Sequence, residues 1–120
     1  GLGGGTFSAI ADFELLKTAS EVCEKRKMKF HVGNVLSADI FYDHEKEQWK
    51  KWKNLGVLAV EMESYGLYQV AAEYGKRAMT ILSVSDWFYN EDQKMTAEER
   101  QSGLLDMINT AIEVAENFAE

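Results

Sequence analysis

Two short apolar runs, each ending in acidic residues, constrain the fold of this chain most strongly. Residues 57–60 are consecutive apolar residues that stop at Glu61, Met62 and Glu63, and the mostly apolar run 79–84 stops at Ser85 and Asp86. An apolar run of this length is typical of a strand buried on both faces of a parallel sheet. Open α/β sheets bind ligands beyond the carboxyl ends of their strands. The pattern therefore predicts three carboxylates at one edge of a sheet.

Helical patterns separate the predicted strands. A strand is expected over 28–36, and helices are expected from 11 to the basic triplet 25–27, over 45–54, over 65–74 and from 96 onward. Asp12 is the predicted N-cap of the first helix, Gly75 the terminator of the third, and Thr96 with Glu99 a capping box for the last. In the last helix, the expected core-facing residues are Leu104, Ile108, Ala111, Ala115 and Phe118. The alternation of helices and strands predicts an α/β fold with a parallel or mixed sheet.

Length and composition limit the classes of protein to which this chain can belong. At 120 residues with 46% hydrophobic content, it fits one domain. Its net charge of −7 argues against a nucleic-acid partner, because a phosphate backbone requires a basic surface. No apolar run approaches the ~20 residues that span a bilayer, so no membrane partner is expected. The single cysteine, Cys23, excludes an internal disulfide and is compatible with a cytoplasmic location.

The glycine-rich residues 1–6 are expected to be a flexible linker or loop remnant, and residues 7–120 a portion of a single larger domain. The chain is accordingly interpreted as a piece of a longer protein.

Several residues that could carry chemistry are better explained as structural. Cys23 lies on the apolar face of the first helix, which predicts a buried thiol. His31 and His44 have no ligand partner at metal-binding spacing, and no metal or cofactor is expected. Trp49 and Trp52 lie three residues apart and are interpreted as a packing or subunit-contact stripe in preference to a ligand cage.

The acidic residues after the strands allow two interpretations. An ionised Glu61 or Glu63 could accept hydrogen bonds from the vicinal hydroxyls of a sugar. Asp86 could protonate a leaving group if its surroundings hold its pKa near the working pH. Alternatively, Glu61 and Glu63 cap the following helix and Asp86 caps a turn. The pattern alone leaves both interpretations open.

Five sequence words, in order and with similar gaps, resemble the C-terminal half of bacterial-type, hexamer-forming purine nucleoside phosphorylases. The words are residues 9–13 (AIADF), 32–42 (VGNVLSADIFY), 60–64 (VEMES), 84–86 (VSD) and 96–101 (TAEERQ). The resemblance covers the chain from about Phe7 to its end. It implies a three-layer α/β/α fold with a mixed central sheet, of which this chain forms the C-terminal part.

The resemblance also implies an activity, the reversible phosphorolysis of purine nucleosides or deoxynucleosides to free base and pentose 1-phosphate in purine salvage. Phosphate is then a co-substrate and no cofactor is needed. A cytoplasmic homo-oligomer is expected, a hexamer when the full chain is present.

By similarity, each site residue has an expected role. Phe41 would stack on the purine or ribose, Val60 and Met62 would line the pocket, and Glu63 would bind the ribose hydroxyls with Glu61 close by. Asp86 would protonate N7 of the purine with the help of Arg100, and Ser85 would hold the edge of the base.

The chain departs from the family pattern in two respects. Trp87 stands where family members often have histidine, which puts the base preference in question. The N-terminal half of the family, which supplies the phosphate site, has no counterpart in this sequence. Two alternatives are kept. One is a uridine phosphorylase or nucleosidase of the same fold, and the other is an inactive truncated fragment that folds and self-associates but has no catalytic activity.

Overall fold

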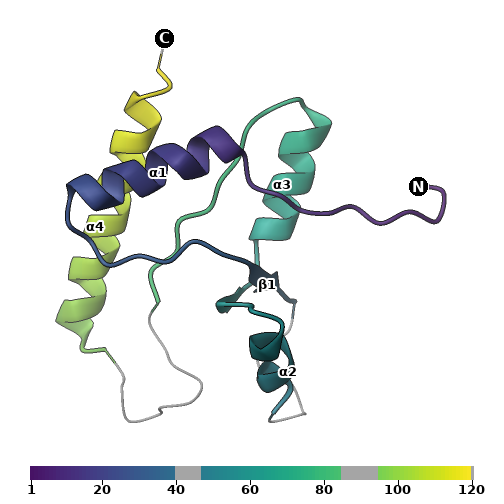
Figure 1. Ribbon diagram of the computed structural model, residues 1–120, viewed down its shortest axis with the longest axis horizontal. Coiled ribbons are helices and arrows are strands. Elements are labelled where there is room, and N and C mark those ends of the chain that lie inside the picture. The colour runs from purple at the N-terminus through teal and green to yellow at the C-terminus, as the bar shows by residue number, and fades with distance from the viewer. Residues whose placement is uncertain (40–46, 85–94, 120) are drawn as a thin grey trace.

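The computed structural model describes residues 1–39, 47–84 and 95–119 as four helices and two strands. The elements are α1 (Phe13–Lys25), β1 (Val35–Ser37), α2 (Gln48–Asn54), β2 (Ala59–Glu61), α3 (Ser64–Glu73) and α4 (Ala97–Glu116). Helices α1 and α4 cross on one side of the molecule, and α2, α3 and the strands lie on the other (Figure 1). The predicted α/β class is confirmed in this coarse form.

The sheet of the described residues consists of two parallel strands. β1 pairs with β2 in the register Val35 to Ala59, Leu36 to Val60 and Ser37 to Glu61. The backbone N–H of Leu58 donates to the Asn34 carbonyl at 2.9 Å, and the N–H of Ala38 donates to the Glu61 carbonyl at 2.9 Å. These two bonds extend the ladder by one residue at each end.

The predicted third strand is absent from the part of the chain that the structure describes. Residues 79–84 are assigned to no strand, and the predicted strand 28–36 is reduced to a pairing that begins at Val35. A strand is defined by hydrogen bonds to a neighbour, and an apolar sequence alone does not supply that neighbour. Leu82 and Val84 are exposed, so this run also lacks the predicted burial on both faces.

The hydrophobic core lies where α1 meets α4. It is formed by Ala19, Val22 and Val114, against which Leu15, Met79 and Phe118 pack. Cys23 is also buried, as predicted, and burial raises the pKa of its thiol despite the nearby Arg26. At the end of α1, the guanidinium Nε of Arg26 donates to Glu113 at 2.7 Å and Lys25 Nζ donates to the same carboxylate at 3.1 Å.

The face of α4 that meets α1 is not the predicted one. Thr110 and Val114 are buried, with Gly103 and Met107 half-buried on the same face. Leu104, Ile108, Ala111 and Ala115 were expected to face the core and are exposed, whereas Phe118 is half-buried as expected. Thr110 is accommodated because its hydroxyl donates to the Asp106 carbonyl at 2.7 Å, so no polar group is left without a partner.

The predicted N-caps and the glycine terminator are confirmed, whereas of the two bonds predicted for the capping box of α4 the structure shows the one to the Thr96 hydroxyl. The Asp12 carboxylate accepts the N–H of Leu15 at 3.0 Å, and the Thr96 hydroxyl accepts the N–H of Glu99 at 3.1 Å. Gly75 has a φ of 63° and terminates α3 in the left-handed conformation.

No helix among the described residues has the length and apolar character needed to span a bilayer. Within the same residues, no group of three or more His, Cys, Asp or Glu side chains could hold a metal ion.

Candidate active site

The parallel pairing brings the carboxyl ends of β1 and β2 to the same edge of the sheet. Ser37 and Glu61 are the last residues of the two strands and lie opposite each other. Asp39 follows β1, and Met62 and Glu63 follow β2. The prediction that Glu61 and Glu63 stand where a strand ends is confirmed. The third predicted carboxylate, Asp86, lies outside the described residues.

The carboxylate of Glu61 joins both strand ends to the start of α3. Its Oε1 accepts a hydrogen bond from the Ser37 hydroxyl, and its Oε2 accepts the backbone N–H groups of Glu63 and Ser64, each at 2.7 Å. The Ser37 oxygen in turn accepts the N–H of Tyr65 at 3.0 Å. Three N–H groups at the start of the helix are thereby satisfied by two side chains from the sheet edge.

This network determines the ionisation of Glu61. Partial burial raises its pKa, but the hydrogen bonds from Ser37, Glu63 and Ser64 outweigh burial and lower the pKa below the ordinary value. The negative charge also lies at the positive end of the α3 dipole. The prediction that these acids cap the following helix is therefore confirmed for Glu61, whereas the Glu63 side chain makes no hydrogen bond that caps α3.

Beyond this network lies a cavity of about 330 Å³. Its lining residues come from the two strand ends and the first turn of α3: Ser37, Ala38, Asp39, Met62, Glu63, Tyr65 and Gly66. Ligand pockets typically start at roughly 300 Å³, so the cavity is large enough for a small molecule. Two carboxylates, two hydroxyls and a thioether give it both hydrogen-bonding and apolar surface.

Among the predicted site residues, Met62 and Glu63 line this cavity and are exposed, so both are accessible to a ligand. Val60 is half-buried in β2, opposite Leu36, and is not among the described lining residues. Phe41 and Ser85 lie outside the described residues, as Asp86 does. Arg100 is exposed in the first turns of α4.

Ser37, Asp39 and Tyr65 reach the site without having been predicted to do so. Tyr65 packs edge-on against Phe7, with ring centroids 6.1 Å apart, and this contact ties the N-terminal arm to α3. The sequence does place a hydroxyl-bearing residue, Ser37, near the end of the first predicted strand. That Ser37 belongs to the site depends on the strand register that pairs it with Glu61, and this register is known only from the fold.

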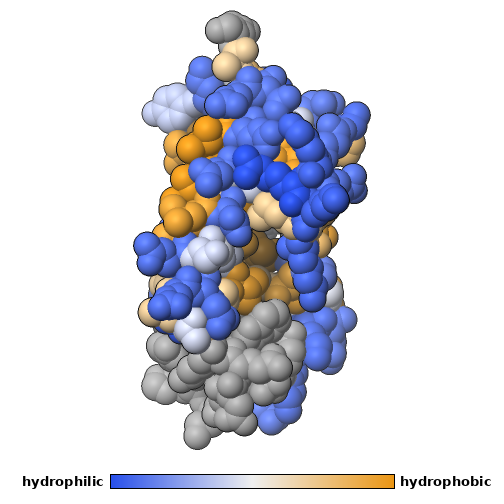
Figure 2. Space-filling model, turned by 90° about the vertical axis from the view of Figure 1, so that its left-hand side faces the viewer, coloured by the Kyte–Doolittle hydropathy of each residue, from blue (hydrophilic) through white to orange (hydrophobic). Residues whose placement is uncertain are grey.

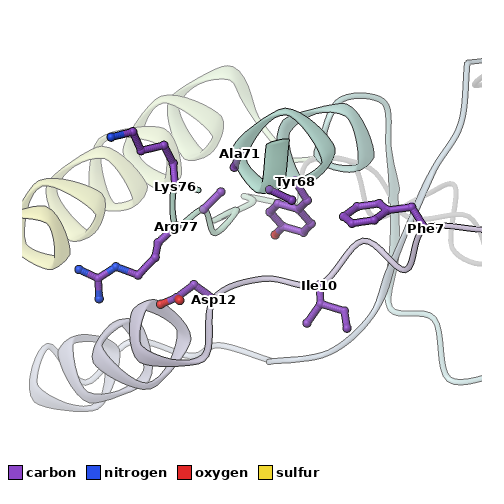
Figure 3. A pocket seen from close by; sticks show the side chains of 9 residues that line it. Phe7, Ile10, Asp12, Tyr68, Ala71, Lys76 and Arg77 are labelled. Atoms are coloured by element: carbon purple, nitrogen blue, oxygen red, sulfur yellow. The ribbon is translucent and has the colours of Figure 1, made fainter. Parts of the chain in front are cut away.

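A second, smaller cavity of about 150 Å³ lies between the N-terminal arm and α3 (Figure 3). Phe7 and Tyr68 stand at one end of it, and Asp12, Lys76 and Arg77 at the other (Figure 3). Asp12 already caps α1, and Arg77 lies over the Phe118 ring at 4.8 Å. The cavity is below the usual size of a ligand pocket, so the larger one at the strand ends is the candidate site.

Comparison with known proteins shows that the family model described as the phosphorylase superfamily matches residues 3–120. Among similar proteins, the purine nucleoside phosphorylase DeoD-type 2 of Vibrio cholerae is 46% identical over 115 residues, which are 96% of this chain and 48% of that protein. The purine nucleoside phosphorylase DeoD-type of Colwellia psychrerythraea is 47% identical over 107 residues, 89% of this chain and 45% of that protein.

A third similar protein, the purine nucleoside phosphorylase DeoD-type of Alkaliphilus metalliredigens, is 44% identical over 114 residues, 95% of this chain and 48% of that protein. The chain thus spans about half the length of the curated relatives that it matches.

Proposed function

This chain belongs to the phosphorylase superfamily, and from that premise we propose that it forms the sugar- and base-binding half of a purine nucleoside phosphorylase. The reaction is reversible phosphorolysis of a purine nucleoside to free base and pentose 1-phosphate. The observation that carries the proposal is the cavity at the carboxyl ends of β1 and β2, lined by Met62 and Glu63. The names of the relatives support the purine class of substrate.

The chemistry asked of this cavity suits its residues. Breaking a glycosidic bond builds positive charge on the sugar and negative charge on the base. Glu63, exposed in the cavity, supplies an anion that can accept the two ribose hydroxyls and stabilise the developing positive charge. Met62 supplies polarizable apolar surface for the ring of the sugar or the base.

Glu61 has a supporting role in this proposal. Because its carboxylate is hydrogen-bonded to Ser37, Glu63 and Ser64, it fixes the backbone from which Met62 and Glu63 extend. The proposed acid is Asp86, which protonates the purine N7 with the aid of Arg100. Ser85 then holds the edge of the base, Phe41 stacks on the substrate and Val60 supports the pocket from β2.

The remaining properties follow from the same proposal. Phosphate is a co-substrate and no cofactor takes part. The complete fold is a three-layer α/β/α sandwich with a mixed sheet, of which β1 and β2 are two strands. The enzyme acts in purine salvage as a cytoplasmic homo-oligomer.

The test is release of free base from inosine, adenosine and uridine, with and without phosphate. It is run with this chain alone and with this chain co-expressed with the N-terminal half of the Vibrio cholerae relative, since this chain spans 48% of that protein. Phosphate-dependent release from purine nucleosides, lost in Asp86→Asn, is expected from the combined halves. Release of free base without phosphate would identify a nucleosidase. A preference for uridine over the purine nucleosides would identify a uridine phosphorylase.

A further inference from the structure

Tyr65 contributes an aromatic ring to the cavity at the carboxyl ends of β1 and β2. Among the described residues that line this cavity, it is the one with an aromatic side chain, and it reaches the cavity from the first turn of α3. Tyr65 is 44% exposed. The cavity therefore offers a ligand an accessible ring, two residues beyond Glu63, which lines the same cavity.

Three contacts hold Tyr65 in place. Its backbone N–H donates to the Ser37 hydroxyl oxygen at 3.0 Å, and its phenol hydroxyl donates to the Phe7 carbonyl at 3.4 Å. The Phe7 and Tyr65 rings lie at 83° to each other, with centroids 6.1 Å apart, which is the edge-to-face geometry that aromatic pairs favour. Because the ring is already fixed, a ligand that binds against it loses little affinity to the cost of immobilising it.

Exposure of an apolar side chain does not by itself indicate a ligand site on this molecule. The face on the α1–α4 side shows hydrophobic patches between its charged groups (Figure 2). Leu55 and Tyr74 are each 73% exposed, and neither lines the two cavities described above. Tyr65 differs because it combines an exposed ring with a fixed position and a place in a cavity of ligand size.

The residues around the ring indicate which part of a nucleoside it contacts. Glu63 is the proposed partner of the ribose hydroxyls and lines the same cavity as Tyr65. A pentose carries hydroxyl groups at its edge and C–H groups on its faces. A sugar whose hydroxyls are bound by Glu63 therefore offers an apolar face to the neighbouring wall, and Tyr65 supplies apolar surface there.

The ring also suits the charge that the reaction creates. The face of an aromatic ring is negative and attracts a cation. Cleavage of the glycosidic bond builds positive charge on the sugar, so this attraction is stronger in the transition state than in the bound nucleoside.

We propose that the Tyr65 ring contacts the sugar of the nucleoside and stabilises the positive charge that develops on it, and that Phe7 is a positioning residue for this ring. The inference rests on the proposed function, to which it adds a residue that contacts the sugar.

The first test measures phosphorolysis of inosine by the combined halves. Tyr65→Leu keeps an apolar side chain but removes the ring, and it is expected to lower kcat about 10-fold while KM changes less than about 3-fold, because the charge develops in the transition state. Tyr65→Phe retains the ring and is expected to stay within about 3-fold of wild type. Tyr68→Leu is the matched control, since Tyr68 lies one turn further along α3 and lines the smaller cavity. Equal losses of kcat in Tyr65→Leu and Tyr68→Leu would overturn the proposal.

A series of fluorinated phenylalanines at position 65 covers the case in which Tyr65→Leu does not fold. Each fluorine withdraws negative charge from the face of the ring and hardly changes its shape. The logarithm of kcat is expected to fall in proportion to the number of fluorines. A kcat that is independent of fluorine number would overturn the electrostatic role.

A double-mutant cycle tests the role of Phe7. Phe7→Ala removes the ring that packs against Tyr65 and is expected to lower kcat about 3-fold. In the Tyr65→Leu background the same change is expected to cause no further loss, because residues that act through one another are not additive. Fully additive losses would overturn the assignment of Phe7 as a positioning residue.

Nuclear magnetic resonance of the Tyr65 ring in the combined halves tests the contact without turnover. Inosine is expected to shift the ring signals, which Tyr65→Phe identifies, whereas hypoxanthine, the base alone, is not. Equal shifts from both ligands would place the ring at the base and overturn the proposal, and so would the absence of a shift with inosine.

These measurements keep the inference separate from the proposed function. Inosine that shifts the Tyr65 ring but releases no base would support the contact with the sugar and refute the phosphorylase proposal. Phosphate-dependent release of base that neither Tyr65→Leu nor fluorination changes would overturn the inference and support the proposed function.

Discussion

Glu61 and Glu63 are two residues apart and have different environments. The carboxylate of Glu61 is bound on both oxygens, to Ser37 and to the backbone at the start of α3. Glu63 is exposed and lines the cavity. The first is therefore suited to holding the site in shape and the second to contacting a ligand.

Exchanging each of these carboxylates for its amide separates the two roles. Glu61→Gln is expected to destabilise the fold by about 1–2 kcal/mol, because the bonds to two N–H groups lose their charge and the Ser37 hydroxyl loses its acceptor. Glu63→Gln is expected to change stability by no more than about 0.5 kcal/mol. In the combined halves it should lower kcat/KM for inosine about 10–100-fold, the effect of losing hydrogen bonds to a charged group. Urea denaturation and base-release assays measure the two effects, and a reversed pattern would exchange the assigned roles.

Glu113 links stability to pH. Hydrogen bonds from Arg26 and Lys25 lower the pKa of its carboxyl. The folded state then binds a proton less readily than the unfolded chain, so this stabilisation is complete above the ordinary pKa of 4.5 and is lost as pH falls through the lower folded value. We expect Glu113→Gln to flatten the fall in melting temperature below pH 4.5, whereas Glu116→Gln at the exposed end of α4 should leave it unchanged. Equal slopes in wild type and Glu113→Gln would refute the linkage.

At this scale, residue roles that depend on near neighbours were predictable. Asp12 and Thr96 cap their helices through residues three positions away, and both caps were predicted. The bond between Ser37 and Glu61 spans 24 residues and exists only because two strands align in parallel register. A single sequence specifies the residues of such a contact but not the register that brings them together.

Helices α1, α2 and α3 end with the same C-terminal motif. After α1, α2 and α3, the residue beyond the cap is left-handed: Lys27, Gly56 and Gly75 have φ angles of 55°, 81° and 63°. In each case the next N–H donates back to the third residue from the helix end, as from Lys76 to Ala71 at 2.8 Å. Lys27 is the non-glycine member of the set. A side chain in this conformation costs roughly 1 kcal/mol.

Lys27→Gly is therefore expected to stabilise the chain by about 0.5–1 kcal/mol, because it removes the steric cost while the backbone bonds stay in place. Gly75→Ala is expected to destabilise it by a similar amount for the opposite reason. Thermal unfolding followed by circular dichroism at 222 nm measures both. A destabilising effect of Lys27→Gly would contradict the assignment of a left-handed conformation to Lys27.

The existence of all four helices was predictable from apolar spacing, but the face used by α4 was not. Its sequence contains two stripes of similar regularity, and apolar spacing favours the one with the larger side chains as the core-facing stripe. The structure buries the stripe with Thr110 and Val114, of which Val114 packs against Ala19 and Val22 of α1, whereas Gly103 on the same stripe lies beside Ser83 and Met95. Which stripe meets which partner depends on what else the molecule contains.

At the scale of the whole molecule, stability is concentrated in the α1–α4 pair. Among the described residues, the buried hydrophobic ones are Ala19, Val22, Cys23 and Val114, all on these two helices. Helix α3 and the strand pair lie on the other side, where the described hydrophobic side chains remain half-buried or exposed (Figure 1). The class of fold was predictable from the alternation of elements, whereas the predicted strand over 79–84 was wrong, because a strand requires a hydrogen-bonded neighbour and this run pairs with no described residue in a sheet.

This division predicts unequal effects for two truncations on α4. Val114 is 3% exposed and packs on Ala19 and Val22, so Val114→Ala should destabilise the isolated chain by about 1–3 kcal/mol. Leu105 is 52% exposed, so Leu105→Ala should cost about 0.5 kcal/mol or less, although it removes more apolar volume. Urea midpoints at several protein concentrations measure both changes. If Leu105→Ala were as costly as Val114→Ala and its effect grew with concentration, the exposed face of α4 would be covered in solution by another copy of the chain. The packing of α1 on α4 would then be only part of what holds the molecule together.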